Sequence, residues 1–314
     1  MEYVRLGSTV SKVSRIGFGC WAIGGHGYGK VDDRKSIDAI HCALDQGINL
    51  FDTADVYGFG HSEEVLAKAL GKNMKDIFVA TKFGVKWDNQ GNTCKDCSPQ
   101  YLRKAVNGSL RRLRTDCIPI YQIHWHDGKT PIYDIIETLL KLQKEGKICY
   151  IGVSNMTKEM LNEVNQQQSI TSIQLPFGLN QTGKAQDLKQ ITSEYDISTF
   201  VYGALGRGLL SGKYDLDANF DECDTRNSDG DFKEKYELNL ELIRTLNKIA
   251  SLYNKTAAQI ALRWVLDQPG ISSALVGIKT RGQVIENACA TGWNLRNEDR
   301  KKLTQISEII SEKK

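Results

Sequence analysis

Eight short apolar runs recur along the chain, separated by segments whose apolar residues have helical spacing. The runs are residues 15–20, 48–54, 76–83, 118–125, 147–155, 172–178, 198–205 and 272–278. Strands that alternate with helices predict a parallel sheet, and nearly continuous apolar strands indicate that both faces of the sheet are covered. Polar residues able to do chemistry follow many different strands, which favours a closed barrel over an open sheet. The sequence therefore predicts an α/β fold, a (β/α)8 TIM barrel.

Capping residues mark several expected helix boundaries. We expect a helix over residues 61–71 with Ser62 as its N-cap. Ser98 and Pro99 predict the start of another helix, with serine as the cap and proline in the first turn. An N-terminal β-hairpin within residues 3–19 is expected to precede the barrel, and additional C-terminal helices are expected to follow it.

Length and charge limit the possible functions. The 314 residues suit one barrel domain over residues 1–314, and a hydrophobic content of 40% supplies a core. The net charge is only +3, with basic and acidic residues interspersed, so neither nucleic acid nor an anionic membrane is an expected partner. No apolar segment approaches the roughly 20 residues of a membrane span. The N-terminus lacks a signal-peptide core, so we expect a cytoplasmic location.

The chain contains eight cysteines, and without an export signal most are expected to be reduced thiols. Cys94 and Cys97 form the one CxxC pair to weigh, and they fall in a stretch that reads as a polar loop. A structural zinc site needs four ligands, and no second CxxC or HxxxH motif completes one. An incidental pair is the favoured interpretation, with a redox or metal role as the alternative.

Four separated residues, each within or after an apolar run, predict a proton-transfer site. They are Asp52, Tyr57, Lys82 and His124, and side chains at the C-terminal ends of barrel strands converge on one face. An ammonium beside a phenol stabilises the phenolate, so Lys82 is expected to lower the pKa of Tyr57. His124 would be a second hydrogen-bond donor to a developing alkoxide. His126 points to the same face while the strand continues, so periodicity alone leaves it as a competitor.

Each of these residues also has an ordinary structural interpretation. In that interpretation Asp52 only caps a turn, Lys82 lies at the rim of the barrel, and Tyr57 only packs. Their joint occurrence after successive strands favours the catalytic interpretation over these alternatives.

Around these residues the chain resembles the aldo-keto reductase superfamily over nearly its whole length. The motifs that carry the resemblance occur in the family order: DTADVYGFGHSEE, FVATKFG, YQIHWHD, GKICYIGVSN and YGALGRGLLSGKY. The last motif, with the later DTRN, is most similar to a bacterial branch that contains stress-associated reductases. The resemblance implies a TIM barrel that binds NADPH without a Rossmann domain, in keeping with the absence of a GxGxxG motif. It also implies that Tyr57 is the general acid that reduces aldehydes and ketones.

The resemblance further implies which residues bind the cofactor and the substrate. The positions at the nicotinamide are Ser154, Asn155, Gln174 and Tyr202. Those in the following loop, where residues 206–213 would lie along the pyrophosphate, are Gly203, Leu205, Arg207, Gly208, Leu210 and Lys213. Those at the adenosine end are Gly277, Lys279, Thr280, Arg281, Gln283, Glu286 and Asn287. The expected substrate walls are Trp21, Trp87 and Trp125, with His126 at the rim.

The basic pair Lys279 and Arg281 favours a 2′-phosphate, and hence NADPH over NADH. The family often has Ser-Pro where this chain has Gly203-Ala204, so the local loop is expected to differ. The polar segment 206–232 is too long for an ordinary connector, and loops of that length are often lids or binding loops.

Three other functions remain as alternatives. The same residues suit an NAD(P)-dependent sugar or alcohol dehydrogenase, or a regulatory cofactor-binding barrel like the β subunits of potassium channels. A Schiff-base aldolase would require a depressed pKa at Lys82, and a neighbouring Asp52 predicts the opposite. The expected partner is a small-molecule carbonyl substrate, and the expected state is a monomer or weak oligomer.

Overall fold

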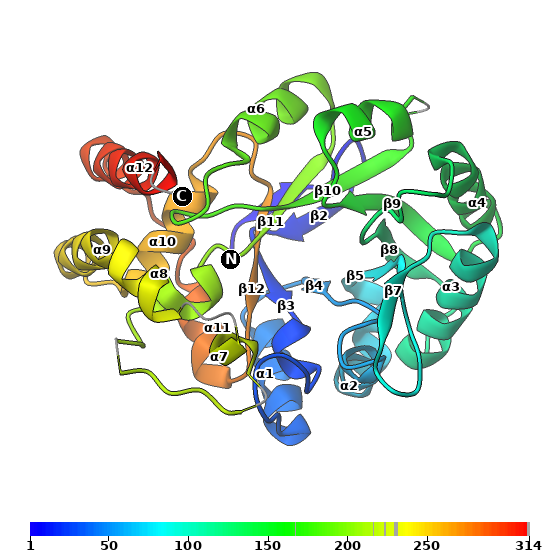
Figure 1. The fold of residues 1–314 in the computed structure, drawn as a ribbon, viewed down its shortest axis with the longest axis horizontal. Coiled ribbons are helices and arrows are strands. Elements are labelled where there is room, and N and C mark those ends of the chain that lie inside the picture. The colour runs from blue at the N-terminus through cyan, green and yellow to red at the C-terminus, as the bar shows by residue number, and fades with distance from the viewer. Residues whose placement is uncertain (167, 216, 223, 229–231, 313–314) are drawn as a thin grey trace.

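The computed structural model describes residues 1–166, 168–215, 217–222, 224–228 and 232–312. Eight parallel strands close into a barrel in the order β10-β11-β12-β3-β4-β5-β8-β9, and helices surround it (Figure 1). The barrel strands are β3 (Ile16–Gly19), β4 (Leu50–Asp52), β5 (Phe78–Phe83), β8 (Ile118–Ile123), β9 (Ile148–Ser154), β10 (Ile170–Pro176), β11 (Ser198–Tyr202) and β12 (Ser273–Gly277). The predicted TIM barrel is therefore confirmed.

Helices lie around the outside of the barrel strands (Figure 1). They are α1 (Asp33–Asp45), α2 (His61–Leu70), α3 (Pro99–Leu113), α4 (Ile132–Lys144), α5 (Lys158–Val164), α6 (Ala185–Glu194), α7 (Thr225–Ser228), α8 (Phe232–Leu238), α9 (Leu240–Tyr253), α10 (Ala257–Leu266), α11 (Arg281–Ala288) and α12 (Asn297–Glu312). Short 3-10 helices are η1 (Trp21–Ile23), η2 (Gly71–Asp76) and η3 (Gly206–Ser211). Among the described helices, none is both long and apolar enough to cross a membrane.

The predicted N-terminal hairpin is present and covers the end of the barrel where the strands begin. Its antiparallel strands are β1 (Tyr3–Arg5) and β2 (Lys12–Ser14). Gly7 donates its backbone N–H to Ser198 Oγ, at the start of β11, over 2.8 Å. Leu6 and Val13 are buried in a cluster with residues from inside the barrel. The hairpin thus covers this end, while the C-terminal ends of the strands are left for a site.

A second hairpin lies where the sequence reads as a polar loop. Its strands are β6 (Val85–Trp87) and β7 (Thr93–Lys95), which pair antiparallel. Asp88 closes the turn, because Oδ1 accepts the backbone N–H groups of Gln90 and Asn92 over 2.8 and 3.0 Å. The prediction of an irregular loop is wrong here, because hydrogen bonds within the turn stabilise a short hairpin that has few apolar residues.

One predicted helix cap is also wrong. The N-cap of α2 is Gly60, whose φ of 100° suits glycine. Ser62 lies inside the helix, where its Oγ donates to the Cys20 carbonyl over 3.0 Å and lies 2.9 Å from Thr53 Oγ1. Its hydroxyl joins α2 to the barrel instead of capping the helix. Ser98 is confirmed as the N-cap of α3, because its Oγ accepts the N–H of Tyr101.

The structure gives the cysteines different environments. Cys117 and Cys149, at the starts of β8 and β9, form a disulfide with a Cα–Cα distance of 6.6 Å, which the sequence did not predict. Cys97 is buried, and burial followed by the charge of Asp127 raises the pKa of its thiol to about 12. Such a thiol is a poor nucleophile and metal ligand, while Cys94 is exposed on β7. The other described cysteines are free: Cys20, Cys42 and Cys289. Cys223 lies outside the described residues.

Candidate active site

The four predicted catalytic residues meet at the C-terminal end of the barrel. Asp52 ends β4, Lys82 lies in β5, His124 follows β8, and Tyr57 lies in the loop between β4 and α2. Lys82 Nζ donates to both Asp52 carboxylate oxygens over 2.8 and 2.9 Å, and lies 3.4 Å from Tyr57 Oη. The centroids of the Tyr57 and His124 rings are 5.9 Å apart. The structure thus brings together groups that are up to 72 residues apart in sequence (124 − 52).

The Lys82 ammonium is held in one place by its partners. Its side chain is 0% exposed, and Nζ also donates to the Thr53 carbonyl over 2.8 Å. Asp52 accepts a further bond of 2.7 Å from Gln174 Nε2. Because a buried charge is tolerated only when it is paired and hydrogen-bonded, these contacts explain how Lys82 lies inside the barrel.

The Tyr57 phenol is a weaker acid than the sequence suggested. Burial raises the pKa of Tyr57 well above 10, and the negative charge of Asp52 raises it further. The expectation that the pKa of Tyr57 lies below its ordinary value is therefore wrong for this arrangement, because burial and Asp52 outweigh the stabilisation that Lys82 gives the phenolate. The physical reason is that Asp52 binds Lys82 through both oxygens, so the pair offers little net positive charge to the phenol. Tyr57 is consequently protonated at neutral pH, as a proton donor must be.

The imidazole beside Tyr57 is uncharged. Burial lowers the pKa of His124 well below 6.5, and the charge of Lys82 adds to the effect. A neutral imidazole carries one N–H to donate. His126, the competing histidine, uses both ring nitrogens in its own loop: Nε2 is 2.9 Å from the Thr130 carbonyl, and Nδ1 accepts the N–H of Gly128 over 3.1 Å. The geometry therefore favours His124 as the partner of Tyr57.

The residues implied for the nicotinamide form a connected group beside these side chains. Ser154 Oγ and the Asn155 N–H both donate to the Gln174 carbonyl, over 3.2 and 3.1 Å. Tyr202 donates its hydroxyl to Asn155 Oδ1 over 2.7 Å, and Asn155 Nδ2 donates to the His124 carbonyl over 3.1 Å. Amide and hydroxyl groups match the donors and acceptors of a carboxamide. These residues therefore fit a nicotinamide.

The loop implied for the pyrophosphate has left-handed backbone at three successive residues. The φ angles of Gly206, Arg207 and Gly208 are 56°, 58° and 97°. Turns that mix right- and left-handed residues can form concave backbone sites for anions. The remaining residues implied in this loop are placed along η3 and just beside it: Gly203, Leu205, Leu210 and Lys213.

The segment after η3 returns to the loop that follows η1. The Thr225 N–H and Oγ1 both donate to the Gly27 carbonyl, over 3.0 and 2.8 Å, and Arg207 Nη2 bonds to Thr225 Oγ1. The Arg226 guanidinium carbon lies 5.5 Å from the ring centroid of Tyr28. The sequence did not predict Tyr28 and Thr225 as residues of this site. They are brought together only because the segment after η3 folds back onto the loop that follows η1.

The residues implied for the adenosine end surround the start of α11. Lys279 Nζ donates to the Tyr28 carbonyl, whereas the Arg281 side chain is 53% exposed and lies 3.7 Å from Asp38. Thr280 and Gln283 form a capping box that begins the helix. The other implied residues lie at the end of β12 and along α11: Gly277, Glu286 and Asn287. Thr280 and Gln283 thus form the capping box of α11, and Lys279 and Arg281 are the cations of this set.

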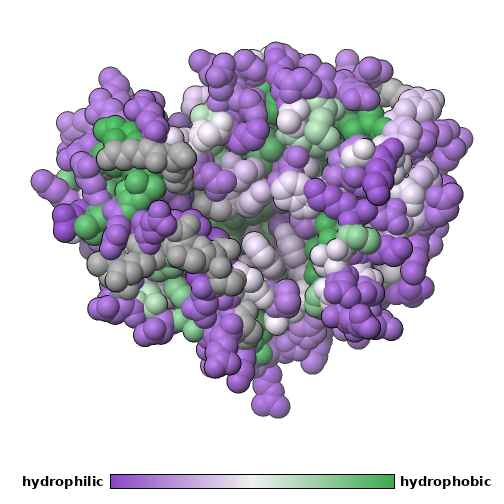
Figure 2. Space-filling model, viewed as in Figure 1, coloured by the Kyte–Doolittle hydropathy of each residue, from purple (hydrophilic) through white to green (hydrophobic). Residues whose placement is uncertain are grey.

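Aromatic rings border the catalytic residues. Trp21 stacks on Tyr57 with ring centroids 5.9 Å apart and planes 20° apart, and Trp125 lies 6.4 Å from the His124 ring. Trp21 and Trp125 are 41% and 39% exposed, so both present ring surface to a ligand. Trp87 is on β6, at the edge of this group. The space-filling view shows a hollow near the centre of one face, with a floor less hydrophilic than its rim (Figure 2).

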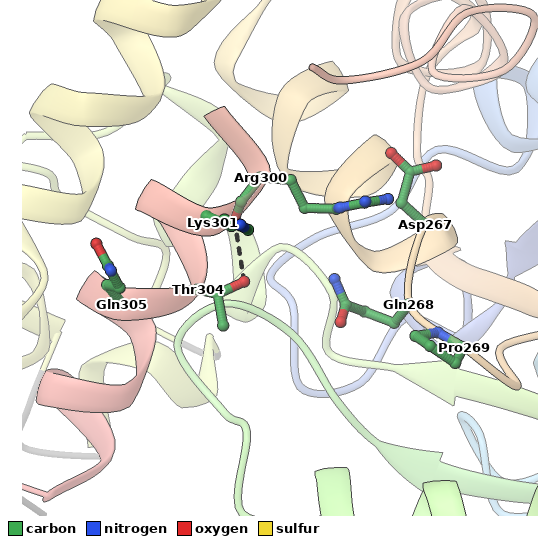
Figure 3. Close-up of a pocket in the computed structure, with 7 residues that line it drawn as sticks. All are labelled: Asp267, Gln268, Pro269, Arg300, Lys301, Thr304 and Gln305. Carbon is green, nitrogen blue, oxygen red and sulfur yellow. Dashed lines mark hydrogen bonds between the residues drawn. The ribbon is translucent and has the colours of Figure 1, made fainter. Parts of the chain in front are cut away.

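A separate open depression lies at the other end of the barrel. Its walls come from the segment before β12 and from α12 (Figure 3). The lining residues are Asp267, Gln268, Pro269, Arg300, Lys301, Thr304 and Gln305. Because this segment precedes the start of β12, the depression is remote from the C-terminal strand ends that carry the catalytic residues.

Asp55, next to these residues, is a fully buried carboxyl group. Burial raises its pKa well above 3.8, and the charge of Glu63 raises it further. A raised folded-state pKa makes the native protein bind a proton that the unfolded chain releases, so stability is lost as pH rises above about 4 towards the folded-state pKa.

We expect Asp55→Asn to raise the free energy of unfolding more at pH 8 than at pH 5, because asparagine needs no proton. The gain should grow by up to about 1.4 kcal/mol per pH unit between the two pKa values. Urea denaturation of both proteins at the two pH values measures this difference. An equal gain at both pH values would show that Asp55 is ionised in the native protein.

Comparison with known proteins gives one consistent result. The aldo/keto reductase family model matches residues 15–308. Aldo-keto reductase YhdN of Bacillus subtilis is 38% identical, over 98% of this chain and 94% of that protein. The NADH-specific methylglyoxal reductase of Escherichia coli is 32% identical over 99% of each chain.

Solved structures agree with these relatives. The glycerol dehydrogenase AKR11B4 from Gluconobacter oxydans superposes with a TM-score of 0.88 at 39% identity, over 97% of this chain and 94% of that one. The fold, the meeting of Asp52, Tyr57, Lys82 and His124, and the match over nearly the whole length lead to one assignment. The chain belongs to the aldo/keto reductase family of nicotinamide-dependent oxidoreductases.

Proposed function

We propose that this protein uses NADPH to reduce aldehydes or ketones to alcohols, with Tyr57 as the general acid. The observation that carries the proposal is the contact among Tyr57, Lys82 and Asp52, with the neutral His124 beside the phenol. The proposed substrate is a small-molecule carbonyl, the proposed location is the cytoplasm, and the proposed state is a monomer or weak oligomer.

Each of the four catalytic residues has a separate role in proton transfer. Bound NADPH would supply the hydride that adds to the carbonyl carbon. Tyr57 Oη donates its proton to the carbonyl oxygen, which becomes the alcohol. Lys82 stabilises the phenolate that remains, and Asp52 holds Lys82 in position. His124 donates a hydrogen bond to the oxygen as negative charge develops on it.

The choice of NADPH rests on two cations at the start of α11. Lys279 and Arg281 lie where the family resemblance implies the 2′-phosphate, and a lysine charge and an arginine fork suit a dianion. The E. coli relative is named as specific for NADH, so family membership alone leaves the choice open.

We expect the Lys279→Met/Arg281→Met variant to bind NADPH at least tenfold more weakly and to bind NADH nearly unchanged. A charge-assisted contact contributes about 1.5–3 kcal/mol, and 1.4 kcal/mol corresponds to tenfold in affinity. Quenching of protein fluorescence by each cofactor measures the change, and added salt should narrow the difference because exposed charges are screened. Arg300→Met/Lys301→Met, an adjacent basic pair at the far end of the barrel, is the matched control. If the wild-type protein binds NADH as tightly as NADPH, the choice of NADPH is wrong.

A second candidate function is alcohol oxidation with the same residues. It is supported by the similarity to a structure named as a glycerol dehydrogenase. In that direction Tyr57 must first lose its proton, so its raised pKa predicts that oxidation needs alkaline pH. Initial rates in both directions at pH 7 separate the two functions, and turnover in either direction argues against a purely regulatory barrel.

A further inference from the structure

An ion pair with a fully buried carboxylate, Glu63, lies on the outer side of β5, behind Lys82. Glu63, in the first turn of α2, is 0% exposed. Its Oε1 accepts the Thr81 hydroxyl over 2.6 Å, and its Oε2 accepts Arg112 Nε of α3 over 2.6 Å. Thr81 immediately precedes Lys82, and successive side chains of a strand point to opposite faces. The Glu63 carboxylate thus joins α2 and α3 to the strand that carries Lys82.

Glu63 is also close in sequence to Tyr57, and the intervening loop has little freedom to move. On the other side of Tyr57, directly after β4, the Thr53 N–H donates to the Ala80 carbonyl over 2.8 Å. Within the loop, the backbone of Gly58 packs so closely against Gly24 that an added Cβ would lie 1.8 Å from the Gly24 carbonyl oxygen. A shift in the first turn of α2 would therefore be passed to Tyr57 instead of being absorbed by the loop.

The charged groups around Glu63 are consistent with an ion pair between Glu63 and Arg112. The titratable groups that face this cluster are Asp55 from the loop, Arg112 and Tyr101 from α3, Tyr121 from β8 and Lys82 from β5. Asp55 is kept protonated by burial and by the charge of Glu63, so Arg112 balances the one carboxylate that it contacts. The Arg112 guanidinium carbon also lies 5.7 Å from the ring centroid of Trp87, on the second hairpin.

We propose that Glu63, held by Thr81 and Arg112, is a positioning residue that sets the distance between the Tyr57 phenol and the Lys82 ammonium. The proposal rests on the proposed function of Tyr57 as the acid. The Nζ–Oη distance of 3.4 Å is near the outer limit of a hydrogen bond, so a small displacement of either residue changes this contact strongly. Replacing an ion pair inside a protein with apolar residues of similar volume is often neutral for stability. We therefore assign the Glu63–Arg112 pair a role in positioning the catalytic residues.

The test removes the link to β5 with the least change of shape. Thr81→Val loses only the hydroxyl that Glu63 accepts and keeps the pair between Glu63 and Arg112. We expect kcat to fall roughly ten- to a hundredfold, as misplacement of reacting groups by about 1 Å can cost a hundredfold. The KM and the Kd for NADPH should change less than about twofold. The pH profile of alcohol oxidation should move to higher pH, because Lys82 then stabilises the phenolate less.

The control is Thr138→Val, which removes a buried hydroxyl that donates to the Asp134 carbonyl within α4, far from the site. It should lower the melting temperature without changing kcat or the pH profile. A Thr81→Val protein that behaves like this control, with a lower melting temperature and unchanged kcat, would overturn the proposal.

A double-mutant cycle tests whether Thr81 and Glu63 act together. Glu63→Gln keeps the shape but replaces one of the two acceptor oxygens by an amide nitrogen that donates, so Thr81 and Arg112 cannot both donate to it in the present geometry. If the two residues act as one unit, the kcat of the double variant should be close to that of the worse single variant, whereas additive losses would contradict the proposal. If Glu63→Gln does not fold, the comparison of Thr81→Val with Thr138→Val still tests whether the link to β5 affects kcat. Full activity of Tyr57→Phe would instead reject the proposed function, so the two failures are distinguishable.

Discussion

Replacement of Tyr57 by phenylalanine is expected to lower the rate of carbonyl reduction by about 10²–10⁴-fold, the usual contribution of general acid catalysis. Phenylalanine keeps the ring that stacks on Trp21 but removes the only hydroxyl of Tyr57. Cofactor affinity should therefore survive the change. The measurement is single-turnover reduction of an aldehyde, in which the chemical step limits the rate.

The matched control is Tyr133→Phe, which removes a hydroxyl from a tyrosine of α4 that is 66% exposed. Its rate should equal that of the wild-type protein. The pH dependence gives a second check, because the wild-type rate of reduction should stay nearly constant from pH 6 to pH 8. Burial keeps Tyr57 protonated and His124 neutral across this range. Near wild-type turnover by Tyr57→Phe would exclude the phenol as the acid.

The barrel was predictable because its signals are local and repeated. Each apolar run corresponds to a strand, and residues at the strand ends must meet once the barrel closes. That reasoning alone brings Asp52 and Lys82 together. It does not choose between His124 and His126, which would share a face of the strand if the strand continued past Ile123. The choice depends on the hydrogen bonds of His126 within its own loop.

The features that the sequence did not predict depend on partners that are distant in sequence, or on the balance of several charges. The lowered pKa expected for Tyr57 followed from Lys82 alone, but Asp52 binds that ammonium with both oxygens and burial then dominates. Glu63 reads as an ordinary acid at a helix start, and its burial against Arg112 has no local signal. The β6–β7 hairpin contains few apolar residues, so its pattern resembles that of a loop.

Replacement of Lys82 by methionine should have two separable effects, one on stability and one on chemistry. It leaves the Asp52 carboxylate buried without its cation, and removing one partner of a buried ion pair costs about 3–5 kcal/mol. It also removes the charge that stabilises the phenolate, so reduction should slow steeply. Residual alcohol oxidation should move to higher pH, because an unopposed Asp52 raises the pKa of Tyr57 still further.

The double variant Asp52→Asn/Lys82→Met separates the two effects. Without either charge, the protein should regain much of the stability lost in Lys82→Met, as measured by urea denaturation, yet remain slow. If the double variant regained activity as well, Lys82 would be only a structural partner of Asp52. Borohydride treatment of the wild-type protein with an aldehyde tests the remaining alternative, because a covalent adduct on Lys82 would require a neutral amine. Two carboxylate contacts on the Lys82 ammonium predict that no adduct forms.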